Sequence, residues 1–247
     1  MSVELAGSTA LVTGATAGIG RAVALQLARL GAEVVVHGRD AERGSETVRE
    51  IESDGGKARF VAADLSSAEQ VRALAAAAGD VDILVNNAGI YRFGSTVDID
   101  DASFTAHLDT NLRAPFILVQ QLAPGMAARG GGSIVNVSTF AASVPARGGG
   151  IYGASKAGLE LMTLVWADEF GSAGVRVNAV AAGPTRTPGT AVYGEAWEVA
   201  ATVTTLGRVA DADEIANAIV FLSSPSASYV TGAVLQVHGG LQAIAPR

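Results

Sequence analysis

A glycine-rich loop between an apolar stretch and an amphipathic stretch constrains this chain more than any other feature. Residues Ala10–Val12 form a short apolar run that is typical of a buried strand. Gly14, Gly18 and Gly20 follow with the spacing Gly-x3-Gly-x-Gly. Apolar residues then recur at helical spacing at Ile19, Val23, Leu27 and Leu30. The sequence therefore predicts a strand, a tight glycine turn and a helix in direct succession.

Such a turn is suited to binding an anion. Glycines permit sharp turns and let a phosphate approach the backbone, while the free N–H groups of the following helix point toward the same place. A second strand, predicted at Glu33–Val36, ends about twenty residues after the loop, where a ribose-binding residue is expected. By itself, the glycine pattern also fits a simple strand-to-helix turn.

Composition limits the class of protein. A length of 247 residues fits one α/β domain, predicted to span residues 1–247. The net charge of −7 argues against nucleic-acid binding, which needs a basic surface. The chain has no cysteine, which excludes disulfides and Cys-bound metals, and we expect no metal site. Because no apolar window is long enough for a membrane span and the N-terminus does not resemble a signal peptide, we expect a cytoplasmic protein with no membrane segment.

The residues after the second strand indicate which cofactor is bound. Gly38 stands where an acidic residue would bind a ribose 2′-hydroxyl, and Arg39 is suited to a 2′-phosphate. This favours NADP(H) over NAD(H). Arg39 could instead be a solvated side chain in a polar turn, and Asp40 could compete as a hydroxyl acceptor. Asp64, after the third strand, could accept a hydrogen bond from an adenine amino group or act as a helix-end charge.

The rest of the chain alternates between strand and helix patterns. The predicted strands are Ala58–Ala62, Ile83–Val85, Ser133–Val137, Val175–Val180 and Ala233–Val237. The predicted helices are Ala41–Ser53, a helix capped by Ser66 that ends near Ala77, Ala102–Arg129, a helix containing Tyr152, and Ala212–Leu222. Residues 184–205, with Val192, Tyr193 and Trp197, resemble a mobile flap more than a core element.

Two further patterns predict functional groups. Pro115 lacks the N–H that would pair with the carbonyl of Asn111, so the long helix should kink there and leave an acceptor suited to holding water. Tyr152 and Lys156 lie four residues apart, which places both on one helix face. The chain has only two lysines, although a Tyr-x3-Lys pair can also arise by chance on a surface.

Taken together, the motifs resemble the short-chain dehydrogenase/reductase family. The motifs, in order, are Thr13-Gly14-x3-Gly18-Ile19-Gly20, Asn86-Asn87-Ala88-Gly89, Asn111, Asn136-Val137-Ser138, Tyr152-x3-Lys156, Tyr229-Val230-Thr231-Gly232 and Gly239-Gly240. The resemblance implies a single-domain, Rossmann-like, doubly wound parallel sheet of about seven strands with helices on both faces. It also implies an NADP(H)-dependent oxidoreductase that interconverts ketones and secondary alcohols.

The resemblance assigns roles to individual residues. Tyr152 is the acid/base, Lys156 holds the nicotinamide ribose and lowers the pKa of Tyr152, and Asn111 maintains a water and proton path. An ammonium about 4 Å from the phenol would lower its pKa by about three units before desolvation opposes it. Cofactor contacts are expected from Gly14, Thr16, Ala17, Gly18, Ile19, Gly20, Arg39, Asp64, Leu65, Asn87, Ala88, Gly89, Tyr152, Lys156, Thr185 and Thr187.

The sequence departs from the family pattern at three places. Thr139 stands where the family has its substrate-binding serine, so Thr139 is the predicted hydroxyl and Ser138 the alternative. Ala182 replaces a proline, and His238 replaces a frequent aspartate. Neither of these two changes predicts a function.

The predicted substrate is a ketone with a hydrophobic part, for example a 3-oxoacyl thioester. The pocket is expected to use Tyr91, Phe93, Val144, Ile151 and residues 184–205. Arg129 matches a position where reductases acting on acyl carrier protein present arginine near the site, whereas Ala173 does not match a second one. The alternatives are a sugar or polyol dehydrogenase and a cofactor-binding regulator without turnover. The resemblance also suggests a homotetramer.

Overall fold

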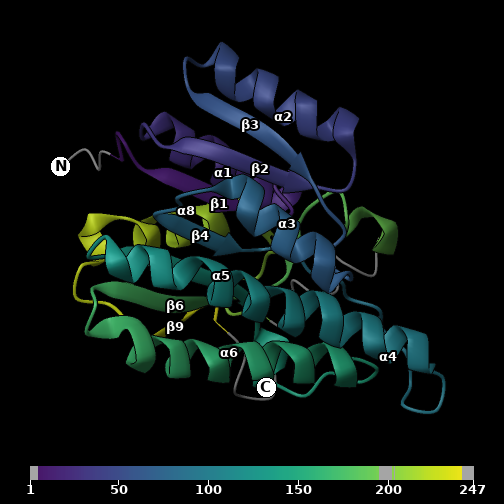
Figure 1. Ribbon diagram of the computed structural model, residues 1–247. Helices are drawn as coiled ribbons and strands as arrows, with labels where there is room; N and C mark the ends of the chain where they lie inside the picture. The colour runs from purple at the N-terminus through teal and green to yellow at the C-terminus, as the bar shows by residue number, and fades with distance from the viewer. Residues whose placement is uncertain (1–4, 195–201, 203, 241–247) are drawn as a thin grey trace.

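The protein is built around one seven-stranded sheet. The computed structural model describes residues 5–194, 202 and 204–240 (Figure 1). The sheet strands are β1 (Thr9–Val12), β2 (Glu33–Gly38), β3 (Lys57–Ala62), β4 (Ile83–Asn86), β5 (Gly132–Thr139), β6 (Val175–Ala182) and β9 (Val234–Val237). All neighbours pair in parallel, in the order β3-β2-β1-β4-β5-β6-β9. The predicted doubly wound, Rossmann-like sheet of about seven strands is confirmed.

Helices cover both faces of the sheet (Figure 1). One face carries α1 (Gly18–Arg29), α2 (Ala41–Ser53) and α8 (Ala212–Ser223). The other carries α3 (Ala68–Ala78), α5 (Ala114–Ala128) and α6 (Gly150–Gly171). Because the five central strands are buried on both sides, their apolar residues run continuously instead of alternating with polar ones.

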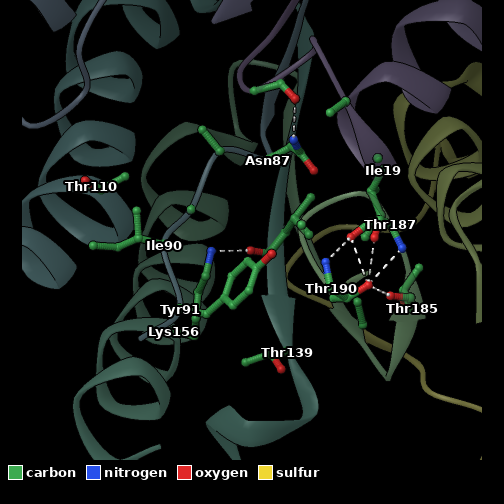
Figure 2. A pocket seen from close by; sticks show the side chains of 18 of the residues that line it. Ile19, Asn87, Ile90, Tyr91, Thr110, Thr139, Lys156, Thr185, Thr187 and Thr190 are labelled. Atoms are coloured by element: carbon green, nitrogen blue, oxygen red, sulfur yellow. Dashed lines mark hydrogen bonds between the residues drawn. The ribbon is translucent and has the colours of Figure 1, made fainter. Parts of the chain in front are cut away.

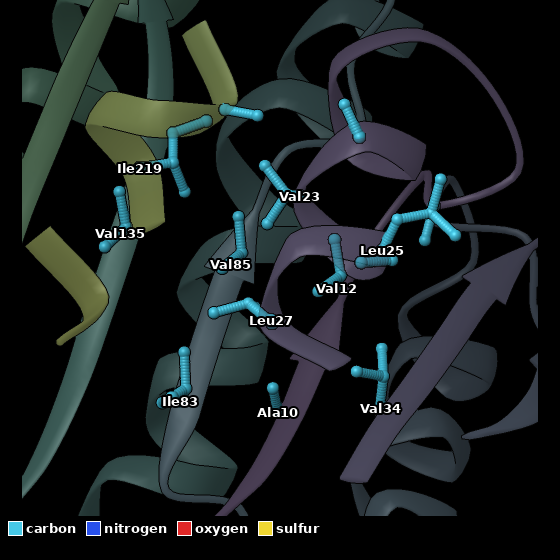
Figure 3. Close-up of a cluster of buried hydrophobic side chains, with 14 of the residues drawn as sticks. Ala10, Val12, Val23, Leu25, Leu27, Val34, Ile83, Val85, Val135 and Ile219 are labelled. Atoms are coloured by element: carbon cyan, nitrogen blue, oxygen red, sulfur yellow. The ribbon is translucent and has the colours of Figure 1, made fainter. Parts of the chain in front are cut away.

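The core on the α1 side holds the glycine loop in place. Val12 on β1, Val23 and Leu27 on α1, and Val85 on β4 are fully buried (Figure 3). Ile219 of α8 belongs to the same cluster. Burying one such side chain stabilises the fold by about 2–3 kcal/mol. This packing fixes the start of α1 against the carboxyl end of β1, where the three glycines lie.

The structure corrects several predicted boundaries. Most strands extend one or two residues further than predicted, because polar residues at their ends still pair in the ladder. Ser67, not Ser66, caps α3 by accepting from Gln70 N at 3.4 Å. The predicted helix Ala102–Arg129 is α4 (Asp101–Leu108), a π-helical turn at Asp109–Arg113 and α5.

The segment from residue 184 onward also differs from its prediction. The sequence predicts a flap with no strand over residues 184–205, but β7 (Thr185–Arg186) pairs in parallel with β8 (Ala210–Asp211). A short 3-10 helix follows at Ala191–Tyr193. Residues 195–201 and 203, including Trp197, lie outside the described residues, so the flap remains a prediction. Within the described chain, no helix combines the length and apolar character needed to cross a membrane.

Candidate active site

A cavity of about 490 Å³ lies at the carboxyl ends of the strands. It includes the point between β1 and β4 where the strand order reverses, which is where open α/β sheets bind ligands. All the predicted catalytic and cofactor-binding residues line it except Gly20 and Asn111. The cavity therefore brings the glycine loop, the cofactor candidates and the Tyr152–Lys156 pair together.

The glycine loop is shaped for close approach of a ligand. Gly14 and Gly18 have φ angles of +65° and +53°, which residues with side chains rarely adopt. A methyl group at Gly20 would lie 2.3 Å from both the carbonyl oxygen of Gly14 and the side-chain nitrogen of Asn87. No side chain caps the start of α1 at Ala17, so the first N–H groups of the helix face the cavity region. This geometry fits a phosphate.

His37 is a site residue that the sequence interpretation missed. Its ring is 2% exposed, and its Nδ1 accepts from the N–H of Gly14 at 3.2 Å. Since Nδ1 accepts, Nε2 carries the proton and donates to the carbonyl of Ala63, also at 3.2 Å. Burial lowers the pKa of His37 to about 4, and the positive charge of Arg39 adds to this effect. The neutral ring thus links the glycine loop to the residue after β3.

Two arginines lie at the far end of the cavity. Arg39 and Arg43 both line it, together with Asp64. Asp40 does not compete for a ligand hydroxyl, because its carboxylate caps α2 and binds Arg43 Nε at 3.0 Å. Asp64 accepts from Ser66 N at 2.9 Å, and this bond, together with the charge of Arg39, lowers its pKa. Arg43 was not predicted, although it follows Arg39 by one helical turn.

Tyr152 is half-buried beside Thr139. Burial raises the pKa of the Tyr152 phenol, and a hydrogen bond with the Thr139 side chain opposes the rise. The hydroxyl of Ser138, in contrast, donates to the Glu160 carboxylate at 2.6 Å. Of the two candidate hydroxyls, Thr139 is therefore the one paired with the tyrosine.

Lys156 lies in the same wall and is 4% exposed. Its ammonium donates to the carbonyl of Val137 at 2.7 Å (Figure 2). Burial lowers the pKa of Lys156 to about 8, while the nearby Glu160 carboxylate raises it. In this structure burial outweighs the opposing effects and holds the pKa of Tyr152 above its usual value, so the expectation that Lys156 lowers that pKa stays a prediction.

Asn111 lies behind the cavity in the π-helical turn and is fully buried. Its side chain donates to the carbonyl of Ile90 and accepts from the N–H of Ile90, both at 2.9 Å. It also donates to Ser155 Oγ at 3.0 Å. The predicted kink takes the form of this π-turn next to Pro115, and the side chain of Asn111 joins the loop after β4 to α6.

Three threonines form the opposite side of the cavity (Figure 2). Thr190 Oγ1 donates to the carbonyl of Thr185 at 3.0 Å and accepts from the N–H of Thr187 at 2.9 Å. Thr185 and Thr187 were predicted, and Thr190 was not. Thr190 therefore holds the tight turn that carries Thr185 and Thr187 in the cavity wall.

Only some of the predicted substrate residues line the cavity. Tyr91 and Phe93 line the cavity, but Val144 and Ile151 are not among its lining residues. Arg129 lies at the amino ends of the central strands, bound to Asp80 at 2.8 Å and to the carbonyl of Val81 at 2.7 Å. Arg129 ends α5, before β5 begins, so within one chain it cannot reach the carboxyl ends of the strands.

The fold and the cavity are those of a dinucleotide-binding domain. Tyr152 and Lys156 line the end of the cavity away from Arg39. Comparison with known proteins narrows this class. Residues 14–242 match the family model described as Enoyl-(Acyl carrier protein) reductase. The chain is 37% identical over 244 residues to a 3-oxoacyl-[acyl-carrier-protein] reductase of Thermotoga maritima, covering 97% of this chain and 99% of the relative.

Comparison with solved structures points to the same class of oxidoreductase. A short chain dehydrogenase/reductase family protein superposes with a TM-score of 0.91 at 52% identity, covering 97% of this chain and 98% of the other. A protein of Beutenbergia cavernae, provisionally described as an NAD(P)-dependent gluconate 5-dehydrogenase with bound NADP, gives 0.92 at 37% identity, covering 97% and 98%. The chain belongs to the short-chain dehydrogenase/reductase family of oxidoreductases.

Proposed function

We propose that the protein is an NADP(H)-dependent ketoreductase that transfers hydride between the nicotinamide and a ketone or secondary alcohol. One observation carries the proposal: the Tyr152 phenol, the Thr139 hydroxyl and the buried Lys156 ammonium line a single cavity that also contains the glycine loop. The relationship to a 3-oxoacyl reductase and the NADP bound to a structural neighbour support it.

The residues present fit the cofactor. Gly14 and Gly18 of the glycine loop line the cavity with no side chain between the backbone and a ligand, and Gly38 lines it beside Thr16. Arg39 and Arg43 offer two positive charges for a 2′-phosphate, and Asp64 a carboxylate for the adenosine end. Lys156, Thr185 and Thr187 would meet the nicotinamide half. When bound, NADPH supplies the hydride.

Residues of the chain itself supply the proton for ketone reduction. Because its pKa is raised, Tyr152 is a neutral phenol at pH 7 and can donate a proton to the oxygen of a ketone as negative charge develops there. Thr139 holds that oxygen through its hydroxyl. Lys156 stabilises the phenolate that remains, and its own bond to Val137 fixes the ammonium in place. Asn111 orients the loop after β4 through Ile90.

The test is turnover of NADPH with a panel of ketones, sugars and polyols by the wild type and by Tyr152→Phe. We expect ketone-dependent oxidation in the wild type and loss of nearly all of it in the variant, because the proton donor is gone. Tyr229→Phe removes the same hydroxyl at a fully exposed site and is the matched control. Full activity in Tyr152→Phe would contradict the proposal, and turnover of sugars alone would favour the sugar dehydrogenase.

Cofactor choice has its own test. Arg39→Ala should lower the preference for NADPH over NADH by about tenfold or more, since a charge-assisted phosphate contact is lost. Arg43→Ala should lower it less, because Arg43 is partly neutralised by Asp40. The measurement is the dissociation constant of each cofactor. An unchanged preference in both variants would contradict the assignment.

A third alternative, the regulator without turnover, predicts tight NADPH binding and no oxidation with any carbonyl compound.

We also propose a homotetramer. Apolar side chains are exposed on two separate faces, one formed by α5 and α6 and one near the edge strand β9. They are Phe116, Leu161, Leu164 and Val165 on the first face, and Phe221 and Leu235 on the second. Two distinct self-complementary faces are what a tetramer with dihedral symmetry needs. The cytoplasmic location stays a prediction.

A further inference from the structure

The substrate end of the cavity is framed by aromatic rings. The ring centroids of Tyr91 and Phe93 lie 6.3 Å and 6.0 Å from that of Tyr152, at interplanar angles of 64° and 70°. The ring of Tyr193 meets Phe93 edge to face at 6.3 Å. These three residues, here called the aromatic wall, come from the loop after β4 and from the short helix Ala191–Tyr193. Tyr91 and Phe93 line the cavity and adjoin Tyr152, the proposed proton donor, whereas Tyr193 packs against Phe93.

The wall is held in position by the backbone. Gly94 donates its N–H to the carbonyl of Gly148 at 2.9 Å, which fixes the chain next to Phe93. A methyl group at Gly189 would lie 2.2 Å from the hydroxyl of Tyr91, so Gly189 is the residue that lets Tyr91 pack against the threonine turn. The backbone contacts therefore fix the positions of the rings that form the aromatic wall.

The same end of the cavity carries little charge. Among the described lining residues, the charged side chains are Arg39, Arg43, Asp64 and Lys156. The first three lie after β2 and β3, at the far end, and Lys156 is bound to the carbonyl of Val137. Apart from Lys156, the residues that line the cavity beside the aromatic wall thus offer no positive charge to a carboxylate or phosphate on the substrate. The electrostatics favour a neutral substrate.

We propose that the substrate is a neutral ketone with an aromatic ring next to its carbonyl group. Aromatic rings prefer edge-to-face and offset contacts with other rings, because the ring edge is positive and the face negative. A saturated ring of the same size or a flexible acyl chain would make the same apolar contacts. It lacks the positive edge and negative face that favour contact between aromatic rings. The proposal rests on the proposed ketoreductase function and narrows its substrate.

The test compares acetophenone with cyclohexyl methyl ketone, which share their carbon skeleton and differ in ring unsaturation. We expect kcat/KM to be about tenfold higher for acetophenone. Conjugation makes acetophenone the less electrophilic ketone, so a preference for it must come from the site. Tyr91→Leu and Phe93→Leu should reduce the ratio toward one, whereas Tyr91→Phe, which keeps the ring, should preserve it. Gly189→Ala should lower the ratio by displacing Tyr91.

A binding measurement separates the possible failures. In Tyr152→Phe, which keeps the ring but cannot turn over, calorimetry in the presence of NADP⁺ should show tighter binding of 1-phenylethanol than of 1-cyclohexylethanol. Equal affinities with equal turnover of both ketones would overturn the aromatic proposal and leave the ketoreductase function intact. Failure to reduce any ketone would instead count against the proposed function. A ratio unchanged by all the leucine variants would show that the aromatic wall does not select the substrate.

Discussion

A buried histidine sets a pH limit on the stability of the cofactor site. The folded protein holds His37 neutral with a pKa of about 4, whereas the unfolded chain takes up the proton near the ordinary histidine pKa of 6.5. Since the unfolded state binds more protons between these values, stability is full above pH 6.5 and falls as the pH drops toward 4.

Comparison with His37→Asn tests this. The asparagine oxygen can still accept from the N–H of Gly14 but does not titrate. Between pH 7.5 and pH 5, the free energy of unfolding of the wild type should fall by about 2 kcal/mol more than that of the variant. Urea unfolding at both pH values gives the difference. Parallel pH dependence in the two proteins would mean that His37 titrates normally in the folded state.

The pKa of Lys156 predicts a pH dependence of the rate of ketone reduction. Burial lowers its pKa to about 8, so the ammonium is present below pH 8 and lost above it. We expect the rate of ketone reduction to decline above about pH 8. Lys156→Arg should lose most activity because the guanidinium lacks the compact donor geometry, and what remains should lack this decline, since arginine stays charged. The measurement is kcat against pH. The same decline in the arginine variant would assign it to another group.

At the scale of elements, strand β1, the glycine turn and helix α1 determine part of the fold and also form part of the proposed cofactor site. The pattern Ala10–Val12, three glycines and a helical apolar stripe predicted β1 and α1 closely, because tight turns and buried stripes depend on local sequence. Gly20 shows the constraint most sharply, since its missing side chain makes room for the backbone of Gly14. Substitution there should disturb both stability and cofactor binding.

Gly20→Ala should lower the free energy of unfolding by about 2–3 kcal/mol, the usual cost of overpacking, and weaken NADPH binding. Gly171→Ala is the matched control, because a methyl group there meets nothing within 4 Å and the residue lies in the last turn of α6. That control should be neutral or slightly stabilising. Unfolding curves and NADPH titration measure both. An unaltered NADPH affinity in Gly20→Ala would argue that the loop does not contact the cofactor.

Other parts of the site could not be predicted from local sequence. His37 carries a weak signal as a polar residue at the end of an apolar strand, but its partners Gly14 and Ala63 come from other strands. The raised pKa of Tyr152 depends on burial by Tyr91 and other distant segments, which sequence spacing does not reveal. The π-turn at Asp109–Arg113 was predicted as a proline kink, because Pro115 signals a lost hydrogen bond but not how the helix accommodates it.

At the scale of the whole molecule, the family motifs predicted the topology, because they mark successive strand ends of one parallel sheet. They did not predict which surfaces remain apolar. On α6, Leu161, Leu164 and Val165 are exposed by 62%, 48% and 38%, and they follow the helical repeat that would otherwise face a core. Phe116 of α5 lies next to Trp166, with ring centroids 6.3 Å apart, and is 44% exposed.

An exposed stripe of this kind is costly in water unless a second copy covers it. We therefore expect Leu161→Glu to convert the proposed tetramer into dimers, because it places a charge in the centre of one face and leaves the β9 face unchanged. Light scattering after size exclusion gives the mass directly. Ser45→Glu, which adds the same charge at an exposed position on α2, should leave the mass unchanged. A wild type that elutes as a monomer at micromolar concentration would contradict the tetramer. Tetramers in Leu161→Glu would show instead that assembly uses other surfaces.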